Sequence, residues 1–213
     1  MKNELKFDKK KHIYTVNGKR VLSVTTVLPD IPEHLLYKQF FIDKTLLGNR
    51  VHGYVDVINK HYMETEKVPD PKLYEGENFL TSDEPYVKAY LKFLRVRRPK
   101  ILFSEEKMFH VKYGYAGTVD LVAAISGKFG VLDVKTTTTI APYAKLQLAA
   151  YVMMYNHRYP SKMVFDRYIV HLKPNATYEV VPYYKKDLKE DFNVFLCKLK
   201  SAQWDMENMS KKY

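Results

Sequence analysis

The chain has 213 residues, of which 46% are hydrophobic and 28% charged, and its formal net charge is +11. This length and composition predict one globular domain with an ample core and exclude a disordered chain. The basic excess favours a polyanionic partner such as nucleic acid, because cationic side chains displace the counterions that phosphates condense, although many basic proteins bind none.

Cysteine usage and terminal composition predict where the protein resides. The sequence has one cysteine, Cys197, so no disulfide can form within the chain. Its setting, FLCKLK, predicts a core cysteine on a helix face. The first ten residues, MKNELKFDKK, are too charged for a signal peptide, and no apolar run reaches the length of a membrane span. We therefore expect a cytoplasmic protein.

Residues 6–28 predict a β-hairpin followed by a further strand. The Asn17-Gly18 pair is a strong hairpin-turn signal between two short strands. Residues 23–28, SVTTVL, are rich in the β-branched side chains that favour a strand.

Helical patterns follow the hairpin. Residues 35–62 have helical periodicity, and Gly48 predicts a division of this segment into two helices. The polar residues 64–82 predict a loop. Residues 81–85, TSDEP, are typical of a helix start, and the basic residues 95–100 fit either the end of that helix or a phosphate-contacting patch.

The rest of the chain predicts a sheet and a last helix. The additional strands are expected over residues 101–111, 116–125, 163–171 and 177–184. Residues 186–208 predict an amphipathic helix in which Trp204 packs against the body of the protein.

One acid–lysine pair carries the strongest chemical signal. Asp133 and Lys135 lie two residues apart in the apolar run VLDVK, so both side chains point to one face of a predicted buried strand. A hairpin turn at residues 127–128 pairs this strand with residues 116–125 and brings Asp120 to the same place. Buried carboxylates need a compensating cation, and Mg²⁺ prefers such oxygen ligands. The pattern predicts a metal site with a lysine beside it, which are the parts needed to hydrolyse a phosphodiester.

Three motifs follow one another: GTVD at 117–120, DVKT at 133–136 and QLAAY at 147–151. In this order and at about this spacing they resemble the RecB-type nucleases of the PD-(D/E)XK superfamily, the branch of stand-alone phage and bacterial exonucleases. The resemblance covers roughly residues 23–151. It implies an α/β fold with a restriction-endonuclease-like core, in which a central mixed β-sheet is flanked by helices and preceded by an N-terminal β-hairpin. The single cysteine excludes the four-cysteine iron–sulfur cluster that some RecB-like relatives carry.

The resemblance also implies roles for individual residues. His52, in GNRVHGYV, and Glu105, in SEEKMF, match the histidine and the acid that precede the first motif, and Glu106 is the fallback for that acid. Mg²⁺ or Mn²⁺ is the implied cofactor. The implied metal ligands are His52, Glu105, Asp120 and Asp133, and the implied catalytic residues are Asp120, Asp133, Lys135, Gln147 and Tyr151. The candidate nucleic-acid contacts are Arg50, Thr136, Gln147 and Tyr151.

Structural interpretations compete with several of these roles. A lone histidine such as His52 is usually structural, and Arg50 is also interpretable as a solvated surface arginine. The hydroxyls of residues 136–139 donate to a phosphate or cap the next helix. Gln147 and Tyr151 lie four residues apart on one helical face, where Tyr151 positions a nucleic-acid strand or packs in the core.

We therefore expect a single nuclease domain over residues 1–213, with the hairpin and helices in 1–100, the catalytic core in 101–184 and the C-terminal helix in 186–208. The expected function is a metal-dependent deoxyribonuclease, most of all an exonuclease on linear or single-stranded DNA ends, in phage or bacterial recombination or repair. A helicase or recombination protein is a candidate partner, since the chain has no Walker A motif. The alternatives are a structure-selective endonuclease of the same superfamily and a non-catalytic nucleic-acid-binding relative.

Overall fold

A mixed β-sheet forms the centre of the computed structural model, which describes residues 4–8, 11–28, 38–70, 73–74 and 79–209. Within these residues the strands are β1 Leu5–Asp8, β2 Ile13–Val16, β3 Lys19–Ser23, β4 Lys100–His110, β5 Tyr115–Ile125, β6 Lys128–Lys135, β7 Asp166–Leu172 and β8 Tyr178–Tyr183. They lie in the order β1-β2-β3-β5-β6-β7-β8, and β4 pairs with β5. The β3–β5 and β6–β7 pairs are parallel and the other pairs are antiparallel.

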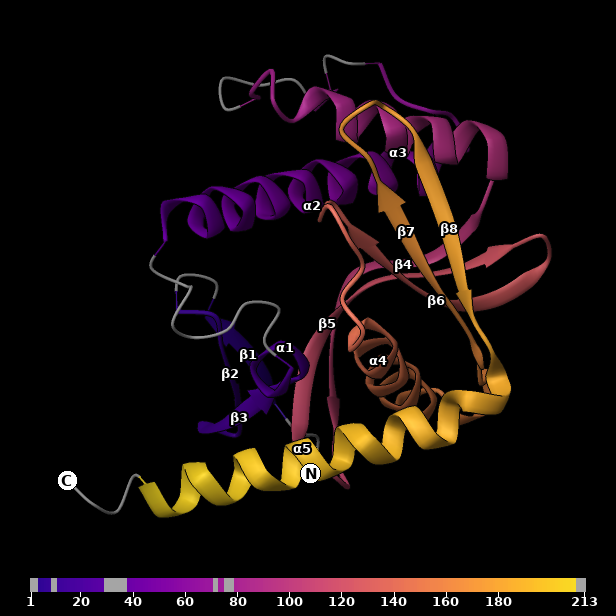
Figure 1. The fold of residues 1–213 in the computed structure, drawn as a ribbon. Helices are drawn as coiled ribbons and strands as arrows, with labels where there is room; N and C mark the ends of the chain where they lie inside the picture. The colour runs from indigo at the N-terminus through magenta and orange to yellow at the C-terminus, as the bar shows by residue number, and fades with distance from the viewer. Residues whose placement is uncertain (1–3, 9–10, 29–37, 71–72, 75–78, 210–213) are drawn as a thin grey trace.

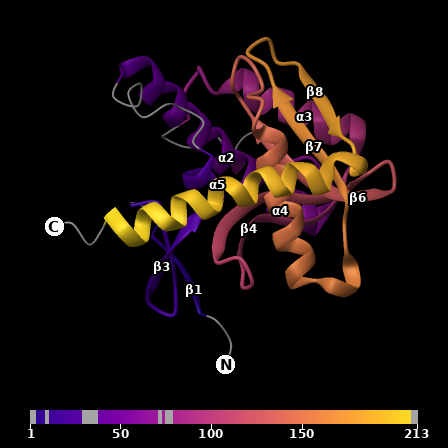
Figure 2. The same cartoon turned by 60° about the horizontal axis from the view of Figure 1, so that its bottom comes forward.

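Helices cover both faces of this sheet. They are α1 Val24–Val27, α2 Gln39–Thr65, α3 Glu84–Arg97, α4 Ala144–Arg158 and α5 Leu188–Met209, with 3₁₀ turns at Pro160–Lys162 and Lys185–Asp187. Figure 1 shows α2 and α3 above the sheet and α4 and α5 below it, and Figure 2 shows α5 crossing α4. The predicted α/β class, with a central mixed sheet, flanking helices and an N-terminal hairpin, is confirmed.

Two hydrophobic cores result from this layering. Side chains alternate along β6, so Leu132 and Val134 pack with α2 and α3, whereas Val131 packs with α4 and α5. Asp133 and Lys135 belong to the second set, on the α4 side. Because the flanking apolar residues are fully buried, β6 carries its two charged side chains through the middle of the protein.

The N-terminal hairpin forms as predicted, but the strand expected after it does not. Asn17 and Gly18 both adopt left-handed conformations, with φ values of 50° and 78°, as a tight hairpin turn requires. β3 ends at Ser23, whose hydroxyl accepts a hydrogen bond from the Thr26 amide at 3.0 Å and caps α1. The prediction of a strand over 23–28 was wrong because this capping bond outweighs the β-propensity of the residues that follow.

The predicted division at Gly48 was also wrong, since α2 runs unbroken from Gln39 to Thr65. A Cβ atom at Gly48 would lie 3.6 Å from the Thr136 hydroxyl oxygen, so this position marks a close approach between α2 and the segment after β6. Residues 35–37 of the predicted helix lie outside the described residues.

Two predictions on α5 were wrong as well. Cys197 is exposed, and Trp204 is 64% exposed, because the buried stripe of this helix runs through Phe192, Phe195 and Leu199 instead. Within the described residues, none of the helices combines the length and the apolar character needed to cross a membrane.

Candidate active site

The predicted site residues gather where β5 changes its neighbour in the sheet. Along one edge, β5 pairs with β3 at Tyr115 and Ala116 and with β6 from Leu121 onward. The GTVD motif lies between these two pairings. The Val134 amide donates to the Asp120 Oδ2 atom at 2.8 Å, so a side chain takes the place of a backbone partner there. Asp120 is thereby fixed beside β6.

Close packing of α4 on this motif explains its glycine. A Cβ atom at Gly117 would lie 3.0 Å from the Tyr151 ring and 3.4 Å from the side chains of Met154 and Val24. Few real Cβ contacts are that tight, so a larger residue would push α4 away from β5. The absence of a side chain at Gly117 therefore allows Tyr151 to approach the carboxylates.

A hydrogen-bonded chain connects α4 to the acid–lysine pair. Lys135 Nζ lies 3.1 Å from Asp133 Oδ2 and donates to Gln147 Oε1 at 3.0 Å. Gln147 Nε2 in turn donates to the Tyr151 hydroxyl at 3.1 Å. The competing interpretation of Tyr151 as a core residue also holds in part, because its side chain is buried. Four side chains of the DVKT and QLAAY motifs thus form one connected group.

A second group of side chains joins this site from α2 and β4. His52 Nδ1 lies 3.3 Å from Glu105 Oε1 and 3.6 Å from Asp120 Oδ2. Glu105 adopts a left-handed conformation with φ of 50° in the middle of β4. Non-glycine residues held in such conformations are strained, and they cluster at functional sites. The strained backbone at Glu105 thus coincides with a side chain that belongs to the predicted metal site.

The pKa values of Asp120, Asp133 and His52 are all raised. Burial raises the pKa of Asp133 to about 7, opposed by Lys135 and reinforced by Asp120. Burial likewise raises the pKa of Asp120, and the nearby His52 opposes this rise. For His52, burial favours a lower pKa, but the carboxylates of Asp120 and Glu105 outweigh it and raise the pKa to about 9. Each buried carboxylate is therefore stabilised by an additional cation or proton.

This donor set fits a divalent cation. One ligand atom each from His52, Glu105 and Asp120 lies within 4.8 Å of the other two. Asp133 Oδ2 is buried without a hydrogen-bond partner in the described part of the chain, although Lys135 is close enough for an ion pair. Carboxylates are ligands for Mg²⁺ and Mn²⁺, and an imidazole suits transition metals, so the set accommodates Mn²⁺ as well as Mg²⁺.

Other residues considered in the sequence lie elsewhere. Arg50 donates from Nε and Nη2 to both carboxylate oxygens of the buried Asp83, at 2.8 and 2.9 Å, so its guanidinium connects α2 to the start of α3. Glu106 is not part of the His52, Glu105 and Asp120 group and pairs with Arg158 at 3.2 Å. Thr136 is near Gly48 of α2, one residue beyond Lys135.

Sequence reasoning missed two contributions to the site. The backbone amide of Val134 holds Asp120, and a backbone group leaves no signal in residue type. Tyr14 of β2 donates or accepts a 2.6 Å hydrogen bond with Thr118 of the GTVD motif, and so ties the N-terminal hairpin to the site. The contact between Tyr14 of β2 and Thr118 of β5 joins residues that are far apart in the sequence, so hydrophobic periodicity could not predict it.

The comparisons with known proteins concern the fold. No protein-family model and no curated protein sequence matches the chain. Among solved structures, the chain is similar to a proposed exonuclease from Eubacterium rectale, with 13% identity, coverage of 75% of this chain and 68% of that chain, and a TM-score of 0.46. It is also similar to an alkaline exonuclease from Laribacter hongkongensis, with 10% identity, coverage of 76% and 92%, and a TM-score of 0.39. A structure of that exonuclease in complex with dAMP has 10% identity, coverage of 90% and 94%, and a TM-score of 0.41. Identities and TM-scores this low leave the function to be argued from the residues of this chain.

Proposed function

We propose that this protein is a Mg²⁺- or Mn²⁺-dependent deoxyribonuclease of the RecB-type PD-(D/E)XK family, acting as an exonuclease in phage or bacterial recombination or repair. The observation that supports it best is the convergence of His52, Glu105 and Asp120 beside the Asp133–Lys135 pair. Three carboxylates lie in this group although the whole chain has a formal charge of +11. A protein that only binds nucleic acid has no use for acids beside phosphates, whereas a cation-dependent hydrolase does.

Each residue has a separate task in this proposal. His52, Glu105, Asp120 and Asp133 would hold the cation, which supplies Lewis-acid chemistry by activating water and stabilising negative charge on phosphate oxygens. Asp133 also holds the Lys135 ammonium by an ion pair of 3.1 Å.

Lys135 is the side chain that meets the reacting groups. Its ammonium orients the attacking water or contacts the phosphate being cleaved, and it stabilises the negative charge that develops there. In hydrolysis the water oxygen bonds to phosphorus as the phosphorus–oxygen ester bond breaks, and the leaving oxygen gains a proton. Gln147 and Tyr151 fix the lysine, because Gln147 accepts from Nζ and donates to the tyrosine hydroxyl.

DNA ends are the proposed substrate. The Q-x-x-x-Y motif of α4 is the sequence feature that favours the exonuclease branch over junction-cutting endonucleases. The basic excess of the chain favours a polyanion. A helicase or recombination protein remains the proposed partner, and the cytoplasm the proposed location.

Degradation of end-labelled linear DNA and of closed circular DNA tests this function. Each substrate is incubated with Mg²⁺, Mn²⁺ or EDTA and with wild type, Lys135→Ala or Lys128→Ala. Lys128 is the matched control, because it is an exposed lysine at the opposite end of the same strand. We expect metal-dependent shortening of linear DNA only, which Lys135→Ala abolishes and Lys128→Ala leaves intact.

The other outcomes separate the alternatives. Cutting of closed circles would replace the exonuclease with an endonuclease. Tight DNA binding without cleavage in either metal would refute the enzymatic proposal and leave a nucleic-acid-binding relative.

A further inference from the structure

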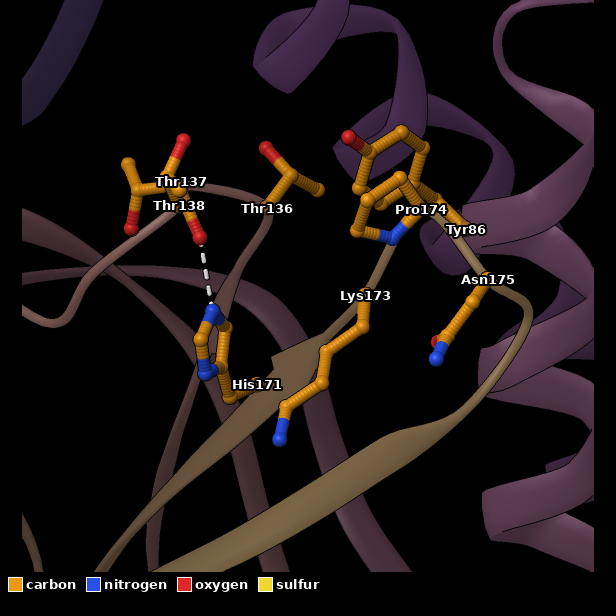
Figure 3. Close-up of a pocket in the computed structure, with 8 residues that line it drawn as sticks. All are labelled: Tyr86, Thr136, Thr137, Thr138, His171, Lys173, Pro174 and Asn175. Carbon is orange, nitrogen blue, oxygen red and sulfur yellow. Dashed lines mark hydrogen bonds between the residues drawn. The ribbon is translucent and has the colours of Figure 1, made fainter.

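A separate pocket lies beside the proposed active site, at the carboxyl ends of β6 and β7. Its volume is about 250 Å³. The two strands are parallel, with Lys135 opposite His171, so the segment that leaves β6 and the segment that leaves β7 are neighbours. Figure 3 shows the threonines of residues 136–138 on one side and Lys173 and Asn175 on the other. Ligands of open α/β sheets bind outside the carboxyl ends of such strands.

Several side chains that can donate hydrogen bonds line this pocket. Within the described residues, the hydroxyls of Thr136 and Tyr86 make no hydrogen bond. The Thr138 hydroxyl oxygen accepts from Lys44 Nζ at 3.2 Å, which leaves its hydrogen to donate. The Asn175 side chain uses Oδ1 to accept from the Thr177 amide and hydroxyl, which leaves its NH₂ group to donate. A ligand rich in acceptors matches this set.

The charges around the pocket favour an anion. None of the residues that line it is acidic, and Lys173 is among them. Lys44 lies at its rim, bonded to Thr138, and Lys135 precedes the threonine segment directly. Glu179 of β8 is an exposed acid that pairs with Lys173 at 2.9 Å and offsets part of that lysine's charge. Positive charge together with hydroxyl and amide donors is the environment that binds a phosphate.

The threonine segment is held in place rather than loosely attached. His171 is buried, and its Nε2 atom donates to the Thr137 carbonyl oxygen at 2.6 Å. The Thr137 hydroxyl donates to the Thr139 carbonyl oxygen at 2.8 Å. These bonds connect the segment to β7 and fix its turn, so the donors of Thr136 and Thr138 are preorganised. His171 is accordingly a positioning residue.

We propose that this pocket binds a phosphate group of the substrate strand, at a nucleotide neighbouring the one whose phosphodiester is cleaved. The inference rests on the proposed nuclease function. Thr136 follows Lys135 directly in the chain, so the pocket begins one residue beyond the lysine that the nuclease proposal places at the cleaved phosphate. The volume corresponds to about eight water molecules at roughly 30 Å³ each, which accommodates one phosphate with its sugar and excludes a duplex.

Binding of a fluorescent single-stranded oligonucleotide in EDTA tests the pocket without cleavage. The pocket variant is the double substitution Thr136→Val and Lys173→Met. The matched control is Thr81→Val with Lys198→Met, which removes the same groups at exposed positions outside the pocket. We expect about tenfold weaker binding for the pocket variant, and a salt dependence whose slope is lower by about 0.7, the value for one single-strand phosphate contact. The control variant keeps the wild-type affinity and slope.

The results distinguish this inference from the nuclease proposal. Equal affinity and slope in the pocket variant and the control would overturn the pocket, even if the protein cleaves DNA. Weaker binding in the pocket variant of a protein that cleaves no DNA would keep the phosphate pocket and overturn the nuclease. A parallel competition with inorganic phosphate identifies the source of the phosphate. The pocket variant could bind the oligonucleotide with wild-type affinity and differ only in that inorganic phosphate no longer competes. That result would overturn the proposal that the pocket binds a phosphate of the DNA strand.

Discussion

Two buried ionic clusters lie on the α4 side of the sheet, and they differ in how their charges are satisfied. Around Arg167 of β7, which is fully buried, Nη1 donates to Asp191 of α5 at 2.7 Å and to the Lys145 carbonyl oxygen at 3.0 Å. Nη2 donates to the Tyr184 carbonyl oxygen at 3.0 Å. Lys145 Nζ lies 3.2 Å from the second oxygen of Asp191. This carboxylate therefore has a cation at each oxygen.

The cluster around Asp133 has the opposite balance. Three carboxylates share two cationic side chains, and the buried Oδ2 atom of Asp133 makes no hydrogen bond within the described residues. The pKa of Asp133 is raised, mainly by burial, to about 7. Asp191 thus has a cationic partner at each oxygen, whereas Asp133 has its ion pair with Lys135. The Arg167 cluster joins α5 to the sheet, whereas the donor set beside Asp133 fits a divalent cation.

The largest expected effect separates activity from stability at Asp133. Asp133→Asn should reduce the rate of DNA cleavage on the order of 10³-fold, because it removes a ligand charge and the partner of Lys135. The free energy of unfolding in EDTA should not fall, because burial disfavours the Asp133 charge more than the attraction to Lys135 favours it, and asparagine carries no charge to bury. Urea unfolding and a cleavage assay on the same preparation measure both quantities. Cleavage within tenfold of wild type would remove Asp133 from the proposed site.

The converse substitution is Arg167→Met. Removing one member of a buried, hydrogen-bonded ion pair leaves the other charge uncompensated, and we expect a loss of about 3 kcal/mol in the free energy of unfolding. Arg158→Met is the matched control, because its pair with Glu106 is partly exposed and contributes less than about 1 kcal/mol. Urea unfolding compares the two. Equal losses would contradict the structural role given to the Arg167 cluster.

Metal binding should stabilise the protein through the unsatisfied cluster. In EDTA-free buffer, Mn²⁺ at 100 times its dissociation constant should raise the free energy of unfolding by about 2.7 kcal/mol. Asp120→Asn should abolish this increase, and Asp205→Asn, an exposed acid of α5, should retain it. Thermal unfolding across a Mn²⁺ titration measures the effect. An equal increase in both variants would place the stabilising cation elsewhere.

The smallest expected effect concerns the chain that fixes Lys135. Tyr151→Phe removes the hydroxyl that accepts from Gln147, at a cost of about 1 kcal/mol in stability, and should slow cleavage about tenfold. Tyr155→Phe is the control one turn later on α4, since the Tyr155 hydroxyl makes no hydrogen bond within the described residues. If both variants cleave DNA at the same rate, Tyr151 is a packing residue only.

Local patterns predicted the parts of the site that lie close in sequence. The two-residue spacing of Asp133 and Lys135 was sufficient to place both on one face of a strand, and they form an ion pair there. The meeting of His52 with Glu105 joins α2 to β4, and only the resemblance to known motifs brought these residues together. The partner of Arg50, Asp83, lies 33 positions away, and nothing in the local sequence indicates that contact.

The mistaken predictions have two causes. Apolar type was taken as a sign of burial at Trp204 and Cys197, but α5 buries only one stripe, and both residues lie off it. At Ser23 a single capping hydroxyl decided the local structure against the propensity of its neighbours. The outcome on α5 depends on which surface the helix meets in three dimensions, whereas the outcome at Ser23 depends on a local bond between residues three apart.

The cluster of His52, Glu105 and Asp120 is the proposed binding site of a catalytic divalent cation next to Asp133. Anomalous diffraction from crystals grown with Mn²⁺, at a concentration that supports DNA cleavage in solution, tests it most directly. We expect one anomalous peak in contact with the Asp120 carboxylate and bounded by His52 and Glu105, and no such peak in Asp120→Asn crystals. Wild-type crystals that show Mn²⁺ only at other positions, from protein that cleaves DNA, would contradict the claim.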